Sequence, residues 1–431
     1  MNAGDYRRSL AFAHDFCSLA ATSADPASLD LGNRMAALML HYLGDQETAR
    51  ANLKHCLARD FAPLGHSQTA RFFLDRDVTV QALLSRIYWL QGFSDQSTCA
   101  AQLAVDRALA IGHALSLCHA LGQAMCPVAL YTGDLVRAED SVTTLLENAA
   151  ERGLAGWIAR GRCFLGMVMI ARSDFAAGLP LLRNALAELR DSGAAPSYPA
   201  FLAILAEGLG RAGQVVDGLA TIDQALMLST QTEEHWCLPE LLRTKGELVI
   251  LDATPDAAAA AERHFLEALD WAGRQQALSW KLRTATSLAH LWRDQHRIAE
   301  AREILEPVYS RFSEGFETAD LQRAKSLLAQ LSLADQPPIS RSSARLRERE
   351  PVGRYHVAKA RAFCINTVSK DDVPDGWRNL RLRIVPVDPR AAHAVRGRET
   401  PALREPRLRY FADANQSRLE TVSKEKLIAR A

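Results

Sequence analysis

The sequence predicts an all-α protein built from stacked helical hairpins, and three observations support this fold class. A spacing pattern returns about every forty residues: a small residue, a second small residue twelve positions later, then apolar residues four and three positions further on. Pairs of turn-forming residues separate the two halves of each copy. The 431-residue chain is 48% hydrophobic but only 7% aromatic, which suits closely packed helices. A fixed period in this range indicates a solenoid.

Five copies of the pattern keep the spacing without interruption. They are Ala37-Ala49-Leu53-Cys56, Cys126-Ala138-Val142-Leu145, Gly166-Gly178-Leu182-Ala185, Ala206-Gly218-Ile222-Ala225 and Ala289-Ala301-Leu305-Val308. A sixth copy with a longer turn is Gly246-Ala261-Phe265-Ala268, and a weaker one is Ser85-Ser97-Ala101-Ala104. Residues three and four apart share one face of a helix, so each small residue marks the point where two helices cross closely.

This register predicts each element in order. Residues 5–22 form a leading helix, and residues 317–333 form an amphipathic helix that caps the last hairpin. Between them lie seven hairpins, at residues 28–59, 78–111, 114–152, 155–191, 197–230, 236–274 and 277–313. Residues 61–77 contain Pro63 and Gly65 and are expected to form a long loop. We therefore predict a repeat domain at residues 1–335.

The remaining residues, 336–431, differ in composition from the repeats. Residues 1–335 carry 30 Lys and Arg against 39 Asp and Glu, whereas residues 336–431 carry 21 against 11. This basic, Pro- and Arg-rich tail has no sustained period, so we predict that it is largely disordered. Its arginines could bind nucleic acid only weakly, because Glu348 and Glu350 interleave with them. The other interpretation is a non-native extension.

No pattern in the sequence supports catalysis or cofactor binding. The adjacent pairs His55-Cys56 and Cys118-His119 do not converge, because neighbouring helical residues point about 100° apart. No H-x-x-x-H pair is present, and the phosphate-binding motif G-x-x-x-x-G-K-[ST] is missing. We therefore expect a protein that is not an enzyme, with no catalytic residue, no cofactor and no metal site.

Several features predict a cytoplasmic protein that has no membrane partner. His14 and Asp15 interrupt the first apolar stretch, so it is not a signal peptide. No apolar run reaches the roughly 18 residues that a membrane span needs. The eight cysteines form no C-x-x-C motif, and Cys56, Cys126 and Cys163 fall on predicted packed faces. This distribution favours reduced thiols in a core.

The concave face of the array is the candidate site for a protein or peptide segment. Positions six before, three before, one after and four after the first small residue of a hairpin should face it. The polar residues selected in this way are Arg160, Glu207, Glu240, Arg243, Glu247, Arg283, His290 and Arg293. The alternative is a helix face whose charges pair with each other, which Glu240, Arg243 and Glu247 would satisfy. The spacing alone leaves both interpretations open.

Aromatic residues precede or begin four successive first helices of the predicted hairpins. They are Trp157, Tyr198, Trp236 and Trp280. We interpret them as packing between neighbouring hairpins, with ligand stacking as the second possibility.

The hairpin pattern resembles the tetratricopeptide repeat, lengthened from 34 to about 40 residues. Several phrases are also similar to the C-terminal repeat region of bacterial ATP-binding winged-helix transcriptional regulators and of related ATPase and adenylate-cyclase regulators. These phrases lie at residues 41–46 (HYLGDQ), 89–96 (WLQGFSDQ), 124–129 (AMCPVA), 242–248 (LRTKGEL), 288–301 (LAHLWRDQHRIAEA) and 314–321 (EGFETADL). The resemblance covers roughly residues 5–333 and does not reach the tail.

The resemblance implies a superhelical solenoid that senses signals and binds proteins. It implies the interaction region of such a regulator, here without the ATPase and DNA-binding modules, and one candidate partner is an ATPase or regulator module. Two alternatives stay open: the regulatory part of a nucleotide cyclase or signalling ATPase, and a stand-alone scaffold that acts in trans.

Overall fold

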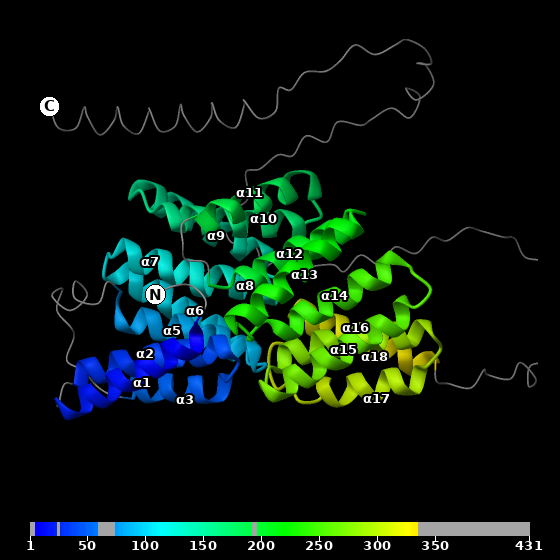
Figure 1. The fold of residues 1–431 in the computed structure, drawn as a ribbon, viewed down its shortest axis with the longest axis horizontal. Helices are drawn as coiled ribbons and strands as arrows, with labels where there is room; N and C mark the ends of the chain where they lie inside the picture. Colours follow the sequence, from blue (N-terminus) through cyan, green and yellow to red (C-terminus); the bar gives the residue numbers. More distant parts are fainter. Residues whose placement is uncertain (1–4, 24–25, 59–73, 192–195, 335–431) are drawn as a thin grey trace, which may run out of the picture. The chain divides into compact units, whose positions relative to one another are not determined.

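The computed structural model describes residues 5–23, 26–58, 74–191 and 196–334, and in these ranges the regular elements are helices. The described helices follow one another as antiparallel pairs (Figure 1), and all of them belong to one compact unit. The predicted all-α, tetratricopeptide-like solenoid is confirmed. The predicted tail at residues 336–431, and most of the loop predicted at residues 61–77, lie outside the described residues.

Seven helical hairpins are present in the described chain, close to the predicted ranges. They are α2 (Pro26–Leu43) with α3 (Gln46–Leu57), α5 (Arg76–Leu90) with α6 (Ser94–Ala110), α7–η1–α8 (Ala114–Ala120, Leu121–Met125 and Cys126–Thr132) with α9 (Leu135–Glu151), α10 (Ala155–Ala171) with α11 (Phe175–Asp191), α12 (Tyr198–Arg211) with α13 (Val215–Thr232), α14 (Leu238–Asp252) with α15 (Ala257–Arg274), and α16 (Leu278–Asp294) with α17 (Ile298–Tyr309). The leading helix is α1 (Tyr6–Thr22), and α18 (Ala319–Ala334) packs on the last hairpin as the capping helix.

Small residues lie at the helix crossings, as the spacing predicts. At the crossing of α10 and α11, a Cβ atom on Gly166 would lie 2.9 Å from Leu182 Cβ and 3.0 Å from the Leu182 backbone nitrogen. A Cβ atom on Gly246 would lie 2.6 Å from the ring of Phe265 on α15. These distances leave no room for a side chain, so the two helices of each hairpin meet through their smallest residues.

The weaker copy of the pattern marks a true crossing as well. Ser85 on α5 and Ser97 on α6 are completely buried. The hydroxyl of Ser97 donates a hydrogen bond of 2.7 Å to the carbonyl oxygen of Ser85. A polar pair therefore replaces the apolar contact of the other hairpins, and its buried hydroxyl is satisfied.

Turns with a left-handed residue followed by aspartate separate the helices of several hairpins. Gly44 and Gly133 adopt φ values of 98° and 83°, which glycine reaches without steric cost. The carboxylates of Asp45 and Asp134 then accept hydrogen bonds of 3.1 and 3.0 Å from the backbone N–H three residues further on. These side chains cap the next helix, as the sequence predicts.

The first helix of the third hairpin contains one π-helical turn, η1, which ends two residues before Pro127. In an α-helix the ring of Pro127 would clash with the carbonyl group four residues earlier. A π-turn widens the backbone at this point and moves that carbonyl away from the ring. The proline therefore accounts for the position of η1.

The same stretch, Ala114–Thr132, corrects one expectation from the sequence. An 18-residue window within its 19 residues has a mean hydropathy of 1.3, so by length and composition the stretch is long and apolar enough to cross a membrane. From the sequence alone we expected no such run. In the structure 61% of that window is buried inside the array, so core packing accounts for its apolar composition.

Hydrogen bonds connect the first two hairpins to the last two. The carbonyl oxygen of Tyr42, in the last turn of α2, accepts hydrogen bonds from the backbone N–H groups of His235 and Trp236, at 2.8 and 3.2 Å. The hydroxyl of Ser279, at the start of α16, donates a hydrogen bond to the carbonyl oxygen of Trp89 on α5. The ends of early first helices therefore meet the beginnings of late first helices.

Ring contacts and turn contacts follow the same pattern. The indole rings of Trp89 and Trp280 meet edge to face with centroids 4.6 Å apart, and Tyr131 stacks on Trp89 at 4.3 Å. At the turn before α9, a Cβ atom on Gly133 would lie 2.9 Å from the Cβ atom of Ala319 on α18. The array therefore closes over the face of its first helices.

We expect alanine substitutions at two glycines of α10 to have opposite effects. Gly166→Ala should lower the free energy of unfolding by about 1–3 kcal/mol, because its Cβ atom has no space at the crossing. Gly156→Ala should raise it by up to about 1 kcal/mol, because nothing lies within 4 Å of that position and alanine is the better helix former. Urea unfolding followed by circular dichroism measures both. The same sign of change in the two variants would contradict the crossing register.

Candidate functional site

The first-helix residues that we predicted for the concave face lie largely inside the array. Arg160 on α10 and Glu240 on α14 are each 5% exposed, and Arg243 on α14 is 7% exposed. The side chain of Arg283 on α16 is 17% exposed. We expected an open groove here, but these four residues are mostly buried within the array. The other four members of the set, Glu207, Glu247, His290 and Arg293, are partly exposed.

Five of the eight predicted residues form one ion-pair cluster. The guanidinium of Arg243 lies 2.7 Å from a carboxylate oxygen of Glu240, 2.5 Å from Glu247 and 3.3 Å from Glu207. The guanidinium of Arg283 lies 3.0 Å from Glu240. The structure therefore shows the internal charge pairing that we named as the alternative for Glu240, Arg243 and Glu247.

Electrostatics fix the protonation state of Glu240. Burial alone would raise the pKa of this carboxyl group, but the nearby Arg243 and Arg283 outweigh burial and lower the pKa to about 2. Although burial lowers the pKa of both guanidinium groups, the carboxylates around them raise it above its usual value. Glu240 is therefore ionised at neutral pH and has no proton to exchange.

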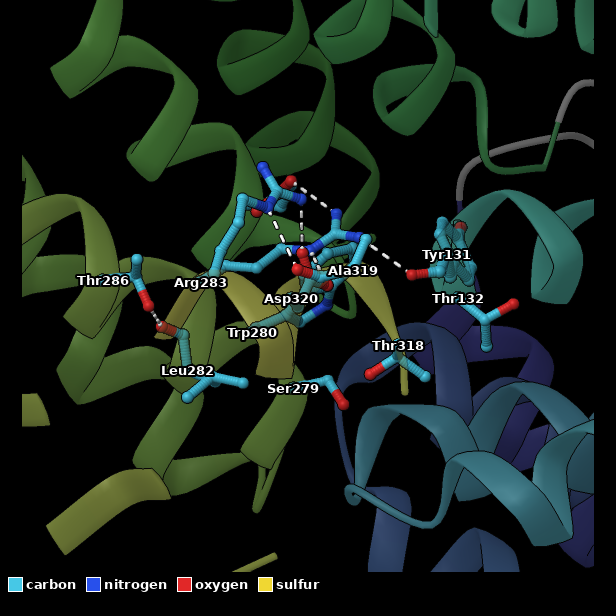
Figure 2. A network of polar contacts seen from close by, with 12 residues as sticks. Tyr131, Thr132, Ser279, Trp280, Leu282, Arg283, Thr286, Thr318, Ala319 and Asp320 are labelled. Carbon is cyan, nitrogen blue, oxygen red and sulfur yellow. Dashed lines mark hydrogen bonds and ion pairs between the residues drawn. The ribbon is translucent and has the colours of Figure 1, made fainter. Parts of the chain in front are cut away.

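Arg283 joins this cluster to other parts of the array, and Figure 2 shows it beside Asp320 and Tyr131. Its Nε lies 2.7 Å from a carboxylate oxygen of Asp320 on α18, and its Nη2 donates a hydrogen bond of 3.2 Å to the carbonyl oxygen of Tyr131. The guanidinium also lies 5.1 Å from the ring centres of Trp89 and Trp280. Such cation–π contacts favour a positive charge that has lost its water.

A cavity lies between the first helices next to this cluster. Its walls are mostly aromatic and aliphatic, and they include Tyr131, Phe164, Met167, Phe201, Trp236 and Trp280. About 590 Å³ of space lies between the lining atoms, but only about 40 Å³ admits the centre of a water molecule. The smaller volume limits what can enter and equals room for about three or four waters. Arg86, Arg160 and Arg283 all reach this cavity.

Arg86, on α5, is only 4% exposed and makes its hydrogen bonds to neutral groups. Its Nη1 donates to the side-chain oxygen of Gln123 at 3.3 Å and to the Tyr42 hydroxyl at 3.5 Å. Its Nη2 donates to the Ser197 hydroxyl at 3.5 Å. The guanidinium lies 4.9 Å from the ring centre of Trp236. These are long contacts for a buried cation.

Arg160 is held in a similar way. Its Nη2 donates a hydrogen bond of 3.0 Å to the carbonyl oxygen of Pro196, and its guanidinium lies 5.5 Å from the ring centre of Phe201. Burial lowers the pKa of Arg160, and the charge of Arg86 lowers it further. Among the described residues, no carboxylate forms an ion pair with either arginine.

Glu234, just before α14, is the carboxylate whose charge acts on these arginines. Its side chain is buried and accepts hydrogen bonds of 2.8 Å from the Ser197 backbone N–H, 2.8 Å from Trp236 Nε1 and 3.1 Å from the Tyr6 hydroxyl. Burial raises the pKa of Glu234, while these hydrogen bonds and the charge of Arg86 lower it. Glu234 therefore fastens α1 and the start of α12 to α14 through neutral donors.

Two predicted residues lie apart from the cluster. Arg293 is near the end of α16, where it pairs with Asp294 at 2.8 Å and bonds to Gln330 of α18 at 3.1 Å. Burial lowers the pKa of His290, and the positive charge of Arg293 contributes in the same direction. These side chains belong to the capped end of the array.

The cavity residues Arg86 and Gln123 were missed, although the register contains the signal for both. Arg86 lies one position after the crossing residue Ser85, and Gln123 lies three positions before the crossing residue Cys126. The same rule that selected the other residues selects these two. Glu234 lies between two helices, where no periodic pattern applies, so nothing in the sequence marks it.

We expect Glu240→Gln to lower the free energy of unfolding at pH 7 by about 3–5 kcal/mol, because it leaves Arg243 and Arg283 without their shared carboxylate. A folded pKa of about 2 lies below the ordinary value of 4.5, so this contribution is fully present above pH 4.5 and is lost as the pH falls toward 2. The difference between parent and variant should therefore shrink across that interval.

Urea unfolding at pH 7 and pH 3 measures this difference, with Glu188→Gln as the control. Glu188 forms a half-exposed ion pair of 2.8 Å with Arg162, so its loss should change stability by less than about 1 kcal/mol. Equal effects of the two substitutions would contradict a stabilising role for the cluster.

Comparisons with known proteins show only remote similarities. No family model matches the chain. An uncharacterized protein from Rhizobium meliloti (strain 1021) is 26% identical over 160 residues, which are 37% of this chain and 16% of that relative. Among solved structures, the apo form of RapI aligns with 70% of this chain and 99% of its own, at 11% identity and a TM-score of 0.43. Yeast Tom70 aligns with 74% of this chain and 58% of its own, at 14% identity and a TM-score of 0.38.

Proposed function

We propose that this chain is the non-catalytic interaction and signal-sensing region of a bacterial ATP-binding transcriptional regulator. It acts in the cytoplasm and binds a protein segment, with an ATPase or regulator module as its partner.

The observation that carries the proposal is that the polar residues of the first helices bind one another. Glu240, Arg243 and Arg283 engage each other and Asp320, and the low pKa of Glu240 removes it as a proton donor or acceptor near neutral pH. An array whose charged groups hold its own helices together suits recognition better than bond-making.

The partner-binding strip that we propose consists of the four accessible members of the predicted set: Glu207, Glu247, His290 and Arg293. They lie on α12, α14 and α16, and each of these first helices packs on the next. The hydroxyl of Ser287 donates a hydrogen bond of 2.7 Å to Glu247, which links α16 to α14 along this strip. Charges of both signs on neighbouring rigid helices suit a polar protein segment.

Two further observations support the regulator context and the compartment. The family-like phrases are distributed over five of the seven hairpins and the segment that leads into α18, and the match with the Rhizobium meliloti protein spans 16% of that relative's length. Repeats of this kind therefore occur within longer proteins. The described cysteines are all free thiols, and five of them are buried, as in reducing compartments.

We expect the full chain to bind an immobilised ATPase module of a regulator of the resembled family, and to bind no ATP. Arg293→Glu should weaken this binding about tenfold or more, because it reverses a charge within the strip. Arg302→Glu is the matched control, since Arg302 lies on the second helix of the same hairpin and is similarly exposed. Biolayer interferometry measures partner binding, and calorimetry measures ATP binding.

Three results would argue against the proposal. Saturable ATP binding by the chain would contradict a purely recognitive role. If Arg293→Glu and Arg302→Glu weakened partner binding equally, the strip would not be the binding site. Binding to a nucleotide-cyclase domain in place of the ATPase module would favour the cyclase alternative.

A further inference from the structure

The cavity between the first helices contains two buried cations that form no ion pair with any carboxylate in the described part of the chain. Arg86 and Arg160 are 4% and 5% exposed, come from different hairpins and reach the same cavity. Their hydrogen bonds go to hydroxyl, amide and carbonyl oxygens. Removing a charge from water is costly unless an opposite charge compensates it, so a protein keeps such a pair at a cost in stability.

The charges around this end of the cavity do not balance. Arg86 and Arg160 contribute two positive charges, and Glu234 contributes at most one negative charge. Burial together with both arginines lowers the pKa of His119 to about 4, and burial and Arg86 lower that of His41, so both rings are neutral at pH 7. At least one positive charge is left in excess among the described residues.

The other charged groups at the cavity are already ion-paired with one another, so they form no ion pair with Arg86 or Arg160. Glu240 reaches the cavity, but Arg243 and Arg283 pair with it, and Arg283 also pairs with Asp320. The excess is therefore confined to the end of the cavity formed by α5 and α10. One singly charged anion would neutralise it.

The walls and the size of the cavity limit how large and how polar the rest of that anion can be. The lining is mostly apolar, and the room corresponds to the volume of about three or four water molecules. A carboxylate matches the planar donors of a guanidinium, and a short alkyl chain matches the apolar wall. Inorganic phosphate would place polar oxygens against aromatic rings.

We propose that this cavity binds a short monocarboxylate of two to four carbons, with Arg86 and Arg160 as the residues that hold its carboxylate group and the aromatic wall as the surface that its alkyl chain contacts. The inference rests on the proposed sensing function and names the ligand class for it. Because binding is measured on this chain alone, a failure to bind carboxylates leaves the partner test unaffected.

The first test titrates the full chain with acetate, propionate and butyrate by isothermal titration calorimetry, in a buffer free of carboxylates and phosphate. We expect saturable binding of at least one of them with one site per chain, and a matching rise in melting temperature. Propionamide has the shape of propionate without its charge and should bind at least tenfold more weakly. Benzoate should not bind, because its ring exceeds the available space.

The second test uses Arg86→Met and Arg160→Met, which keep apolar bulk and remove the charge. Each should weaken carboxylate binding by about tenfold or more, because hydrogen bonds to a charged group are lost. The melting temperature of the ligand-free variants should stay equal or rise, since an uncompensated buried charge is gone. Arg162→Met is the matched control, because Arg162 is also on α10 but pairs with Glu188 at the surface, and binding should stay within twofold.

Several outcomes would overturn the inference. They are the absence of binding by all three carboxylates, equal binding of propionamide, equal binding of inorganic phosphate, and unchanged carboxylate affinity in folded Arg86→Met and Arg160→Met. Because the titrations of the parent chain do not depend on the variants, a variant that fails to fold does not remove the test.

Discussion

The array depends on one kind of contact: helix ends satisfied by distant helix ends. The last carbonyl groups of an α-helix and its first N–H groups have no partner within the helix. Here the carbonyl of Tyr42 in the last turn of α2 accepts hydrogen bonds from His235 and Trp236, which directly precede α14. The carbonyls of Trp89 and Tyr131, in the last turns of α5 and α8, accept hydrogen bonds from side chains of α16, the Ser279 hydroxyl and the Arg283 guanidinium. Packing between adjacent hairpins builds the stack, and these long-range hydrogen bonds close it.

Closure explains why charged residues lie in the interior. Once early and late hairpins meet, the polar side chains of the first helices lose water and must find partners. Glu240, Arg243, Arg283 and Asp320 do so as a network, in which each carboxylate lies between guanidinium groups. Within the described residues Arg86 and Arg160 bond only to neutral groups, so the same closed face contains guanidinium groups with and without a carboxylate partner.

Most of the fold could be predicted from the sequence, because packing between neighbouring helices requires small and apolar residues at fixed spacings. The small residues Gly166 and Gly246 each indicate that a partner helix crosses there, and the structure shows both crossings. The contacts between distant hairpins produce no such pattern in the sequence. Trp236 and Trp280 were interpreted as packing between neighbours, and Trp280 Nε1 does donate to the Trp236 carbonyl at 3.1 Å. However, Trp280 also meets Trp89, which no repeat period indicates.

The candidate site was predictable in its residues but not in its exposure. The register selected Arg160, Glu240 and Arg243 as inward-facing, yet whether that face is open depends on how far the array curls. That curvature is the sum of small rotations between hairpins, and no single residue encodes it.

The closing contacts also set an order in time. Trp89 and Ser279 are 190 residues apart, and at about 5–20 residues per second a ribosome needs roughly 10–40 seconds to make that stretch. During this interval the nascent hairpins expose Tyr42, Trp89 and Tyr131 with their covering helices not yet synthesised. These aromatic residues of the N-terminal half therefore stay exposed until the C-terminal half has been synthesised and has packed on them.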